Sequence, residues 1–401
     1  MKLGIDRLLE EDGLRRPLRG RRLALLGHPA SLTAVGRHSL DALIEGTDLT
    51  IAAALGPQHG MRGDKQDNMV ESPDYEDPRH GIPVFSLYGD VRYPTSAMLD
   101  SFDCLLVDLQ DIGTRIYTYL TTLAYLLEAC AAAGKALWVL DRPNPVGRPI
   151  EGSLLEPGWE SFVGAGPLPM RHGLTLGELA RWFVAERGLS LDLQVVTMSG
   201  YAPTGGPGWG WPLGELPWVN PSPNAASLNM ARCFPGTVLF EGTTLSEGRG
   251  TTTPLELVGA PDLDGYRLLA RMMNLAPAWL DGCLLRPCWF LPTFHKHVGQ
   301  LCGGVQIHTD NRHYRHERFR PYRLGALLLK AIRLERPDHP IWRHFAYEYE
   351  TERLAIDLLA GGTFLREWVD DQEATPADLE AHLAPDEAVW REAVQPFLCY
   401  P

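Results

Sequence analysis

The sequence predicts an α/β protein in which a mainly parallel sheet, with helices on both faces, is followed by a smaller α+β domain. Short apolar runs alternate with helical segments through the first 200 residues, as in sheets built from strand–helix–strand units. Several runs are apolar at every position, which is typical of strands buried on both faces. The alternation ends near residue 200, where Gly, Pro and Trp become frequent. We therefore expect an α/β domain over 1–200, a linker over 201–230, and an α+β domain over 231–401 that forms the other wall of a cleft.

Six apolar runs of strand length lie in the first half of the chain. They are Arg22–Leu26, Leu49–Leu55, Pro83–Leu87, Cys104–Leu109, Ala136–Leu140 and Leu193–Met198. Helical patterns between them are clearest at Tyr117–Ala133 and at about Thr175–Arg187, and a glycine follows each segment as a stop signal. Thr175 and Glu178 have the spacing of a capping box, which predicts where the second of these helices begins.

The second half of the chain is less regular. The expected strands lie near Thr237–Phe240, Leu284–Phe290 and Gly304–His308, and the expected helices near 264–274, 323–335 and 387–397. The linker carries Trp209, Trp211 and Trp218, which either anchor it on the domain interface or form a platform on which a sugar stacks.

Charge and cysteine content narrow the classes of partner. The 401 residues include 37 Lys and Arg against 50 Asp and Glu, a net charge of −13. This charge argues against nucleic acid and against an anionic membrane surface as partners, although it is compatible with a local basic pocket. The 7 cysteines are unpatterned and the N-terminus has no apolar signal segment, so we expect reduced thiols and a cytoplasmic location. The oligomeric state is left open.

Polar loops follow three of the expected strands and read GPQHGMRGD, QDIGTRIYTY and DRPNPVG. The carboxyl ends of parallel strands share one edge of a sheet, so these loops should converge on one crevice, where α/β proteins bind ligands. A single such loop would more simply cap a helix or form local ion pairs, but three in register favour a site. The side chains expected there are His59, Arg62, Asp64, Asp108, Asp111, Arg115, Asp141, Arg142 and Asn144.

Several nucleotide-binding and nucleophile motifs are missing from the sequence. There is no G-x-x-x-x-G-K-[ST], and the loop after the first strand reads GHPAS in place of G-x-G-x-x-G. No G-x-S-x-G elbow occurs either. We therefore expect neither a dinucleotide nor a nucleoside-triphosphate cofactor. A crevice of carboxylates, Arg, His and amides with aromatic rings nearby suits a sugar, because glycoside hydrolysis uses carboxylates as acid and base.

Two polar segments of the second half have competing interpretations. Phe240–Pro261 places Glu241, Glu247 and Arg249 among glycines, and it is either a solvated hairpin or, as we favour, a wall of the site. A run of cysteine and histidine then follows with the spacing C-x4-C-x6-H-x-H-x4-C. This spacing matches no standard zinc pattern, so we expect buried side chains there and no metal.

Ten blocks of sequence occur in one order from about Gly4 to the C-terminus. They read GPQHGMRGD, IPVFSLYG, LLVDLQDIGTRIYTYLTTLAYLLEA, VLDRPNPVG, EGSLL, SFVG, RHGLTLGELA, PWVNPSPN, FPGTVLFEGTTLSEGRGTT and FLPTFHKHVGQLCGGVQ. Together they resemble the NamZ-type exo-β-N-acetylmuramidase family. The resemblance implies a Rossmann-like N-terminal domain, a smaller C-terminal domain and an active-site cleft between them. It also implies a glycoside hydrolase that removes terminal N-acetylmuramic acid from the non-reducing ends of peptidoglycan fragments without a cofactor.

One position departs from the family pattern. The family's catalytic acid is the Glu of its G-P-E-H-G block, and the residue here is Gln58, whose amide cannot serve as a general acid. Either another acid of the loop acts instead, or the protein is a non-catalytic sugar-binding or sensing protein or has altered specificity. The candidate acids are Asp64 and Glu71, with Glu247 as a second carboxylate. Glu71 is the expected donor because it lies in the stretch that differs from the family.

The remaining matching positions imply the groups that bind the substrate, which we expect to be a small molecule or an oligosaccharide. These residues are His59, Asp111, Arg115, Asp141, Arg142, Asn144, Arg171, His172, Asn224 and Arg249. We expect Gln58 and Arg62, from the same loop as His59, to bind the substrate with them.

Overall fold

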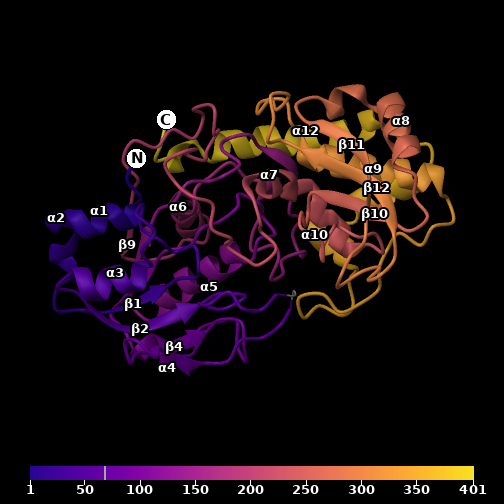
Figure 1. Cartoon of the computed structure of the whole chain (residues 1–401). Coiled ribbons are helices and arrows are strands. Elements are labelled where there is room, and N and C mark those ends of the chain that lie inside the picture. Colours follow the sequence, from indigo (N-terminus) through magenta and orange to yellow (C-terminus); the bar gives the residue numbers. More distant parts are fainter. Residues whose placement is uncertain (67–68) are drawn as a thin grey trace.

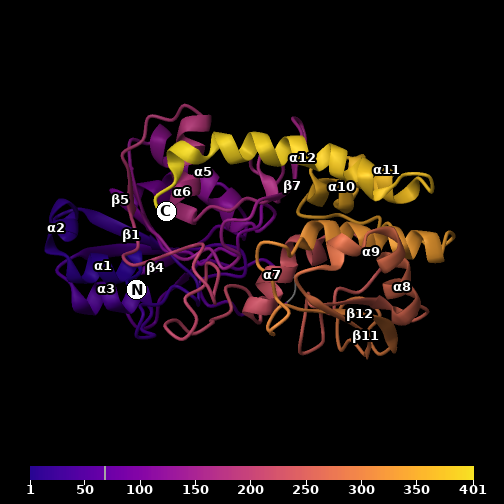
Figure 2. The ribbon, with the colours of Figure 1, turned by 90° about the horizontal axis from the view of Figure 1, so that it is seen from above.

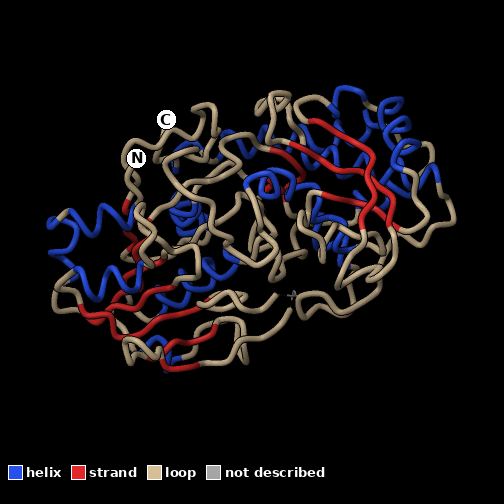
Figure 3. Tube along the Cα trace, in the orientation of Figure 1, coloured by secondary structure: helices blue, strands red, loops and turns tan. Residues whose placement is uncertain are grey.

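The computed structural model of the protein describes residues 1–66 and 69–401. Its larger sheet contains β1 (Arg22–Leu26), β2 (Thr50–Gly56), β3 (Tyr75–Glu76), β4 (Pro83–Ser86), β5 (Cys104–Val107), β6 (Ala136–Leu140) and β9 (Leu193–Val196). The strand order is β3-β4-β2-β1-β5-β6-β9, and all neighbours are parallel except β3 and β4. Figure 1 labels β1, β2, β4 and β9 of this sheet, and Figure 3 shows its strands in red. Numbered along the chain, the six parallel strands follow the Rossmann order 3-2-1-4-5-6, which confirms the predicted sheet.

Helices cover both faces of this sheet, as expected. Those of the first half are α1 (Gly4–Glu10), α2 (Asp12–Arg15), α3 (Ser39–Gly46), α4 (Ser96–Asp100), α5 (Tyr119–Ala132) and α6 (Leu176–Glu186). Successive side chains of a strand point to opposite faces, so Leu25 of β1 joins the core with α1 and α3, whereas Leu26 joins the core with α5 and α6. The capping box is confirmed as well, because Thr175 Oγ1 accepts from the Glu178 backbone and Glu178 accepts from the Thr175 backbone.

The second half of the chain forms a smaller antiparallel sheet of β10 (Leu257–Ala260), β12 (Cys302–His308) and β11 (Leu284–Phe290), in that order. Its helices are α7 (Leu228–Thr237), α8 (Gly265–Leu275), α9 (Pro321–Glu335), α10 (Ala355–Ala360), α11 (Phe364–Asp370) and α12 (Pro376–Ala393). The strand expected at Thr237–Phe240 is wrong: α7 ends there and a 3-10 turn, Val238–Gly242, follows. All of these residues are buried, and a short, fully apolar run does not distinguish a buried strand from a buried helix.

The helix α12 connects the two halves of the molecule. Figure 2 shows it as a long yellow rod that extends from the C-terminal helices back toward α6. It packs against a hairpin of β7 (Glu151–Leu154) and β8 (Pro169–Arg171), which the sequence pattern does not predict. The helix begins at Pro376, earlier than the 387–397 expected, because Thr375 and Asp378 form a capping box at its start.

Among the described residues, no helix combines the length and apolar character that crossing a membrane requires.

Candidate active site

A pocket lies where the loops after β2 and β5 meet the second half of the chain. Its polar lining consists of Gln58, His59, Thr118, Ser222, Asn224, Glu241, Arg249, Tyr347 and Glu348. Apolar side chains, among them Met230, Phe234 and Leu255, complete it. The crevice at the carboxyl edge of the sheet is therefore present, with walls from both halves of the chain. The loop after β6 contributes none of the described lining residues.

Gln58 is presented by a tight turn directly after β2. Gly60 N donates a hydrogen bond to Pro57 O (2.8 Å), which closes the turn around Gln58 and His59. His59 has φ of 68°, a left-handed conformation that non-glycine residues adopt only at a cost. At the strand end, Gly56 is required by space, since a Cβ there would lie 2.6 Å from Met61 N. The backbone thus directs Gln58 off the sheet edge and into the pocket.

Glu348 enters the pocket from a second tight turn, in the C-terminal half. Tyr347 and Glu350 exchange backbone hydrogen bonds of 2.9 and 3.0 Å, so Glu348 and Tyr349 are the two central residues. Both have positive φ, 46° and 70°, as in the type I′ turns that normally carry Asn and Gly. Strained backbone of this kind concentrates at functional sites, where surrounding contacts hold it in place.

The two turns meet through a direct hydrogen bond between their side chains. Gln58 Nε2 donates to Glu348 Oε1 (3.0 Å), and Tyr88 Oη donates to Glu348 Oε2 (2.7 Å). Thr118, at the start of α5, donates its hydroxyl to Gln58 Oε1 (2.6 Å) and so fixes which way the amide faces. All four side chains are buried. The Glu348 carboxyl therefore has one donor on each oxygen.

The surroundings of Glu348 favour its protonated form. Burial raises the pKa of Glu348 to about 7, and the negative charge of Glu241 adds to the rise. The hydrogen bonds from Tyr88 and Gln58 and the positive charge of Arg92 act in the opposite direction. Arg92 lies over the rings of Tyr88 (4.4 Å) and Tyr349 (3.8 Å). A substantial fraction of Glu348 is consequently protonated at neutral pH.

Glu241 and Glu247 belong to a buried charge network on the opposite wall. Arg249 bonds to Glu241 and, at 3.1 Å, to Glu247, and Lys296 Nζ lies 2.6 Å from Glu247. Tyr347 Oη donates to Glu241 Oε2 (2.8 Å). Burial acts to raise the pKa of Glu247, but Lys296, Arg249 and His295 outweigh it and lower that pKa to about 2. Glu247 is thus held ionised, and Arg249, not Glu247, reaches the pocket lining.

Two of the acids predicted from sequence lie outside the pocket lining. Asp64 is exposed and pairs with Lys65 (2.7 Å). Glu71 is exposed too, and it pairs with Arg92 (3.1 Å) and accepts from Tyr349 Oη (3.3 Å). Of the other predicted residues in this loop, His59 lines the pocket, and its Nδ1 lies 2.8 Å from Lys65 O. Arg62 does not line the pocket, and its guanidinium lies 4.2 Å from the centre of the Tyr75 ring.

Of the remaining predicted binding residues, Asn224 and Arg249 line the pocket. Asn224 Nδ2 donates to Gln66 O (2.9 Å), which ties the linker to the loop after β2. Asn224 thus joins Gln58 and His59 in the pocket lining.

The other predicted residues do not line the pocket and are buried among protein groups. Arg115 donates to three carbonyls, those of Ser153 (2.8 Å), Leu168 (2.7 Å) and Leu359 (2.9 Å). Arg142 pairs with Asp108, with Nη2 2.8 Å from Oδ2.

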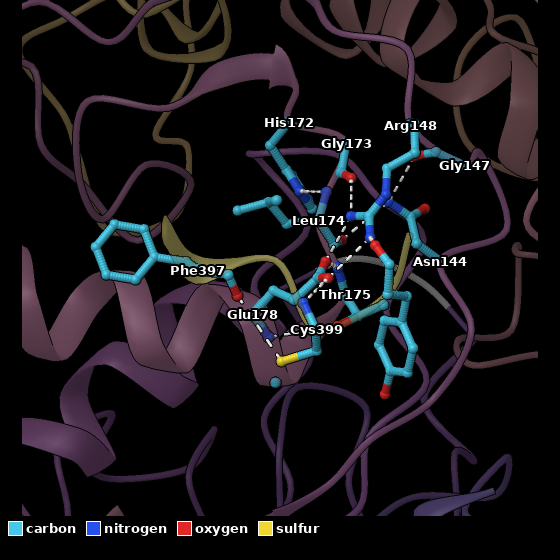
Figure 4. A network of polar contacts seen from close by, with 12 residues as sticks. Asn144, Gly147, Arg148, His172, Gly173, Leu174, Thr175, Glu178, Phe397 and Cys399 are labelled. Atoms are coloured by element: carbon cyan, nitrogen blue, oxygen red, sulfur yellow. Dashed lines mark hydrogen bonds and ion pairs between the residues drawn. The ribbon is translucent and has the colours of Figure 1, made fainter. Parts of the chain in front are cut away.

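Figure 4 shows a further part of this interior, centred on Arg148 and Glu178, which pair at 2.6 and 2.8 Å. Asn144 donates to Leu174 O (2.9 Å) at its edge, and His172 Nδ1 accepts from Leu174 N (3.2 Å). The contacts of Asn144 and Arg148 thus join the loop after β6 to the start of α6 and the segment before it.

Three more predicted residues complete this interior. Asp111 accepts from Gly113 N (2.6 Å), and Arg171 donates to Val146 O. Asp141 accepts from Gly177 N (2.8 Å) and from the hydroxyls of Thr175 and Tyr400.

Sequence reasoning missed Tyr88, Thr118, Tyr347 and Glu348. The available signal for the last two was the run FAYEYE at 345–350, in which acids alternate with aromatic residues in an otherwise charged region. Its connection to Gln58 spans 290 positions along the chain, and no local pattern indicates a contact of that length.

The described residues contain one group of three His, Cys or acidic side chains close enough to share an ion: Asp41, Glu45 and His80. Arg79 bonds to both carboxylates of this group, at 2.9 and 2.6 Å, and Arg37 also pairs with Glu45, so two arginines balance the two carboxylates. The predicted linker tryptophans are packed: Trp209 stacks on His316 (5.4 Å between centroids), and Trp211 packs against Trp218 (5.0 Å).

Comparisons with known proteins agree with this architecture. The N-terminal model of the exo-beta-N-acetylmuramidase NamZ family matches residues 23–229, and its C-terminal model matches residues 232–400. The peptidoglycan beta-N-acetylmuramidase NamZ of Bacillus subtilis (strain 168) is 39% identical over 375 residues, which cover 92% of this chain and 84% of that protein.

Two crystal structures of DUF1343 family proteins from Bacteroides fragilis NCTC 9343 have the same fold. The first has a TM-score of 0.87 and 29% identity and covers 100% of this chain and 99% of its own. The second has a TM-score of 0.75 and 26% identity and covers 100% and 98%.

Proposed function

This chain belongs to the NamZ family of exo-β-N-acetylmuramidases, and from that premise we propose that it is a glycoside hydrolase acting on peptidoglycan fragments. The bond to be hydrolysed joins a terminal N-acetylmuramic acid to the next group. The observation that carries the proposal is the pocket at the sheet edge, which combines a carboxyl group that is partly protonated at neutral pH with an ion-paired carboxylate, Glu241. Glycoside hydrolysis requires a proton donor of this kind at the leaving oxygen.

The rest of the lining suits an acidic amino sugar. Arg249 is the one arginine among the described residues that line the pocket. A guanidinium binds a carboxylate well, and the lactyl carboxylate is the group that distinguishes muramic acid from glucosamine. His59, Ser222 and Asn224 offer hydrogen-bonding groups for hydroxyls and the acetamido group. Met230 and Phe234 supply apolar surface for the sugar ring.

The test is release of 4-nitrophenol from the β-N-acetylmuramide glycoside, measured across pH. The matched control substrate is the β-N-acetylglucosaminide, which lacks only the lactyl group. We expect turnover of the muramide and at least about a tenfold lower kcat/KM for the glucosaminide, because a charged pair in a buried site contributes more than about 1.4 kcal/mol. Absence of turnover on the muramide at micromolar enzyme contradicts the proposal.

A second candidate function is sugar binding or sensing without catalysis, which Gln58 favours because it replaces the acid of the family's G-P-E-H-G block. Calorimetry with N-acetylmuramic acid fragments separates the two functions. Binding without any turnover supports the binding protein, whereas binding with turnover supports the hydrolase.

A further inference from the structure

The pocket contains two buried carboxyl groups in different electrostatic settings. Glu241 is ion-paired with Arg249 and accepts from Tyr347. Glu348 forms no ion pair with a lysine or arginine in the described part of the chain, and its two contacts are the neutral donors Gln58 and Tyr88. Environments that separate two carboxyl groups in this way assign them different roles, one ionised and one able to donate a proton.

We propose that Glu348 is the general acid of this enzyme and that Gln58, fixed by Thr118, positions it. This inference rests on the proposed function, since it names the proton donor of that same site.

Geometry supports the assignment at each step. Glu348 lines the pocket from a turn whose two central residues both have positive φ. This strained backbone conformation fixes where the Glu348 side chain leaves the main chain. Gln58 and Tyr88 each hold one carboxyl oxygen, which leaves the group few orientations. A second carboxylate at position 58 would stand about as close to Glu348 as the amide does and would compete for its proton. The amide avoids this conflict because it can only donate or accept a hydrogen bond.

Charged groups and hydrogen-bond donors from several elements act on the pKa of Glu348. Glu241 opposes its ionisation, and burial does so more strongly, while Arg92, Tyr88 and Gln58 favour it. The resulting pKa of about 7 is close to the ideal for a general acid at neutral pH, because the acid is then available and still transfers its proton readily.

The chemical step is balanced as follows. The Glu348 carboxyl gives its proton to the glycosidic oxygen as the C1–O bond breaks, and the bonding electron pair leaves with that oxygen, which becomes the new hydroxyl. Water adds to C1 and loses one proton to solvent, and solvent returns a proton to Glu348. The products are the free sugar and the released hydroxyl compound, and the enzyme is unchanged.

The test compares wild type with Glu348→Gln on two muramides that differ in leaving group. The unactivated substrate is a disaccharide, whose leaving oxygen must be protonated, and the activated one is the 2,4-dinitrophenyl glycoside, which departs without a proton. We expect Glu348→Gln to lose about 100-fold or more in kcat on the disaccharide but less than about tenfold on the dinitrophenyl glycoside. Glu352→Gln is the matched control, since it makes the same change at an exposed position of the same loop.

The pH profile gives a second readout. Wild-type kcat should fall as pH rises through about 7, and Glu348→Gln should lack this limb. Gln58→Ala removes a hydrogen bond that lowers the pKa of Glu348, so the fall in its remaining activity should move to higher pH. This variant tests the proposal even where Glu348→Gln folds poorly.

The outcomes separate the two proposals. A wild-type enzyme that hydrolyses muramides, with Glu348→Gln equally impaired on both substrates or not impaired at all, overturns the role of Glu348 and leaves the function standing. An unmoved pH limb in Gln58→Ala overturns the positioning role of Gln58. A wild type inactive on both muramides overturns the proposed function and the general acid together.

Discussion

Arg92 is the residue that links the exposed edge of the site to its buried acid. It bonds to Glu71 on the surface (3.1 Å) and lies over the ring of Tyr88, which donates to Glu348. The sequence predicted Glu71 as the proton donor because it lies in a divergent stretch, but Glu71 is exposed and paired with Arg92, whereas Glu348 is buried in the pocket. What distinguishes Glu348 is its surroundings, which a sequence pattern does not contain.

The substitution Glu71→Gln therefore separates the two acids. Removing an exposed charge beside Arg92 disturbs the setting of Tyr88 only indirectly, and exposed ion pairs contribute about 0–1 kcal/mol. We expect kcat on the disaccharide to change by less than about tenfold. A loss of about 100-fold or more, with activity on the dinitrophenyl glycoside preserved, would falsify this expectation and return the acid's role to Glu71.

Asp141 gives a prediction about stability. Burial raises its pKa to about 6, against hydrogen bonds from Tyr400, Thr175 and Gly177. Because this folded-state pKa lies above the ordinary aspartate value of 3.8, the folded state retains a proton that the unfolded state loses. Asp141 therefore contributes stability that is fully present below about pH 4 and is lost as pH rises to about 6.

The measurement is urea denaturation of wild type and Asp141→Asn between pH 4 and pH 7. The free energy of unfolding of wild type, relative to the variant, should fall by roughly 3 kcal/mol over this range and then stay level. A difference that stays constant, or grows with pH, contradicts the raised pKa.

At the scale of elements, the sequence predicted what depends on near neighbours in the chain. The strands β1, β2, β5 and β6 were found because each is apolar almost throughout, and α6 because its capping box lies within four residues. The prediction of a strand at Thr237–Phe240 was wrong because a segment that is buried on all sides is apolar throughout and shows neither the helical nor the strand periodicity. Part of the candidate site could be predicted for the same reason, because Gln58 and His59 directly follow the strand β2, which the sequence predicts. Glu348 could not be predicted, because it lies in a turn outside every helix and strand.

Two glycines set the distance between α7, which lines the pocket, and α9. A Cβ at position 325 would lie 2.6 Å from Gly236 O, a backbone atom that cannot move aside by itself. We expect Gly325→Ala to lower the free energy of unfolding by about 1–3 kcal/mol, even though alanine favours a helix, because overpacking separates the two backbones.

Thermal or urea unfolding of that variant measures the effect, with Gly13→Ala as the control. Gly13 lies in α2 with no atom within 4 Å of an added Cβ, so this substitution should leave stability unchanged or raise it by up to about 1 kcal/mol. Equal effects of the two substitutions would show that the α7–α9 contact is not tight.

At the scale of the whole molecule, one buried carboxylate connects the hairpin of β7 and β8 to the helices α9 and α12. Glu151 of β7 accepts hydrogen bonds from the backbone N–H groups of Tyr322 (3.1 Å) and Arg323 (2.9 Å), in the first turn of α9. An anion at a helix N-terminus satisfies donors that have no partner within the helix. Arg323 also pairs with Glu380 and Glu387 of α12, so β7, α9 and α12 meet at this point.

The last prediction follows from that junction. Glu151→Ala leaves two buried N–H groups of α9 unsatisfied and removes a negative charge beside Arg323, so the free energy of unfolding should fall by about 3 kcal/mol or more. The comparison variant Glu380→Ala removes a half-exposed partner of the same arginine and should cost about 1 kcal/mol or less. Neither residue lines the pocket, so kcat below the melting temperature should stay within a few-fold of wild type. If Glu380→Ala lowers the free energy of unfolding as much as Glu151→Ala does, the ion pairs of Arg323, and not the hydrogen bonds at the start of α9, are the main stabilising interaction of this junction.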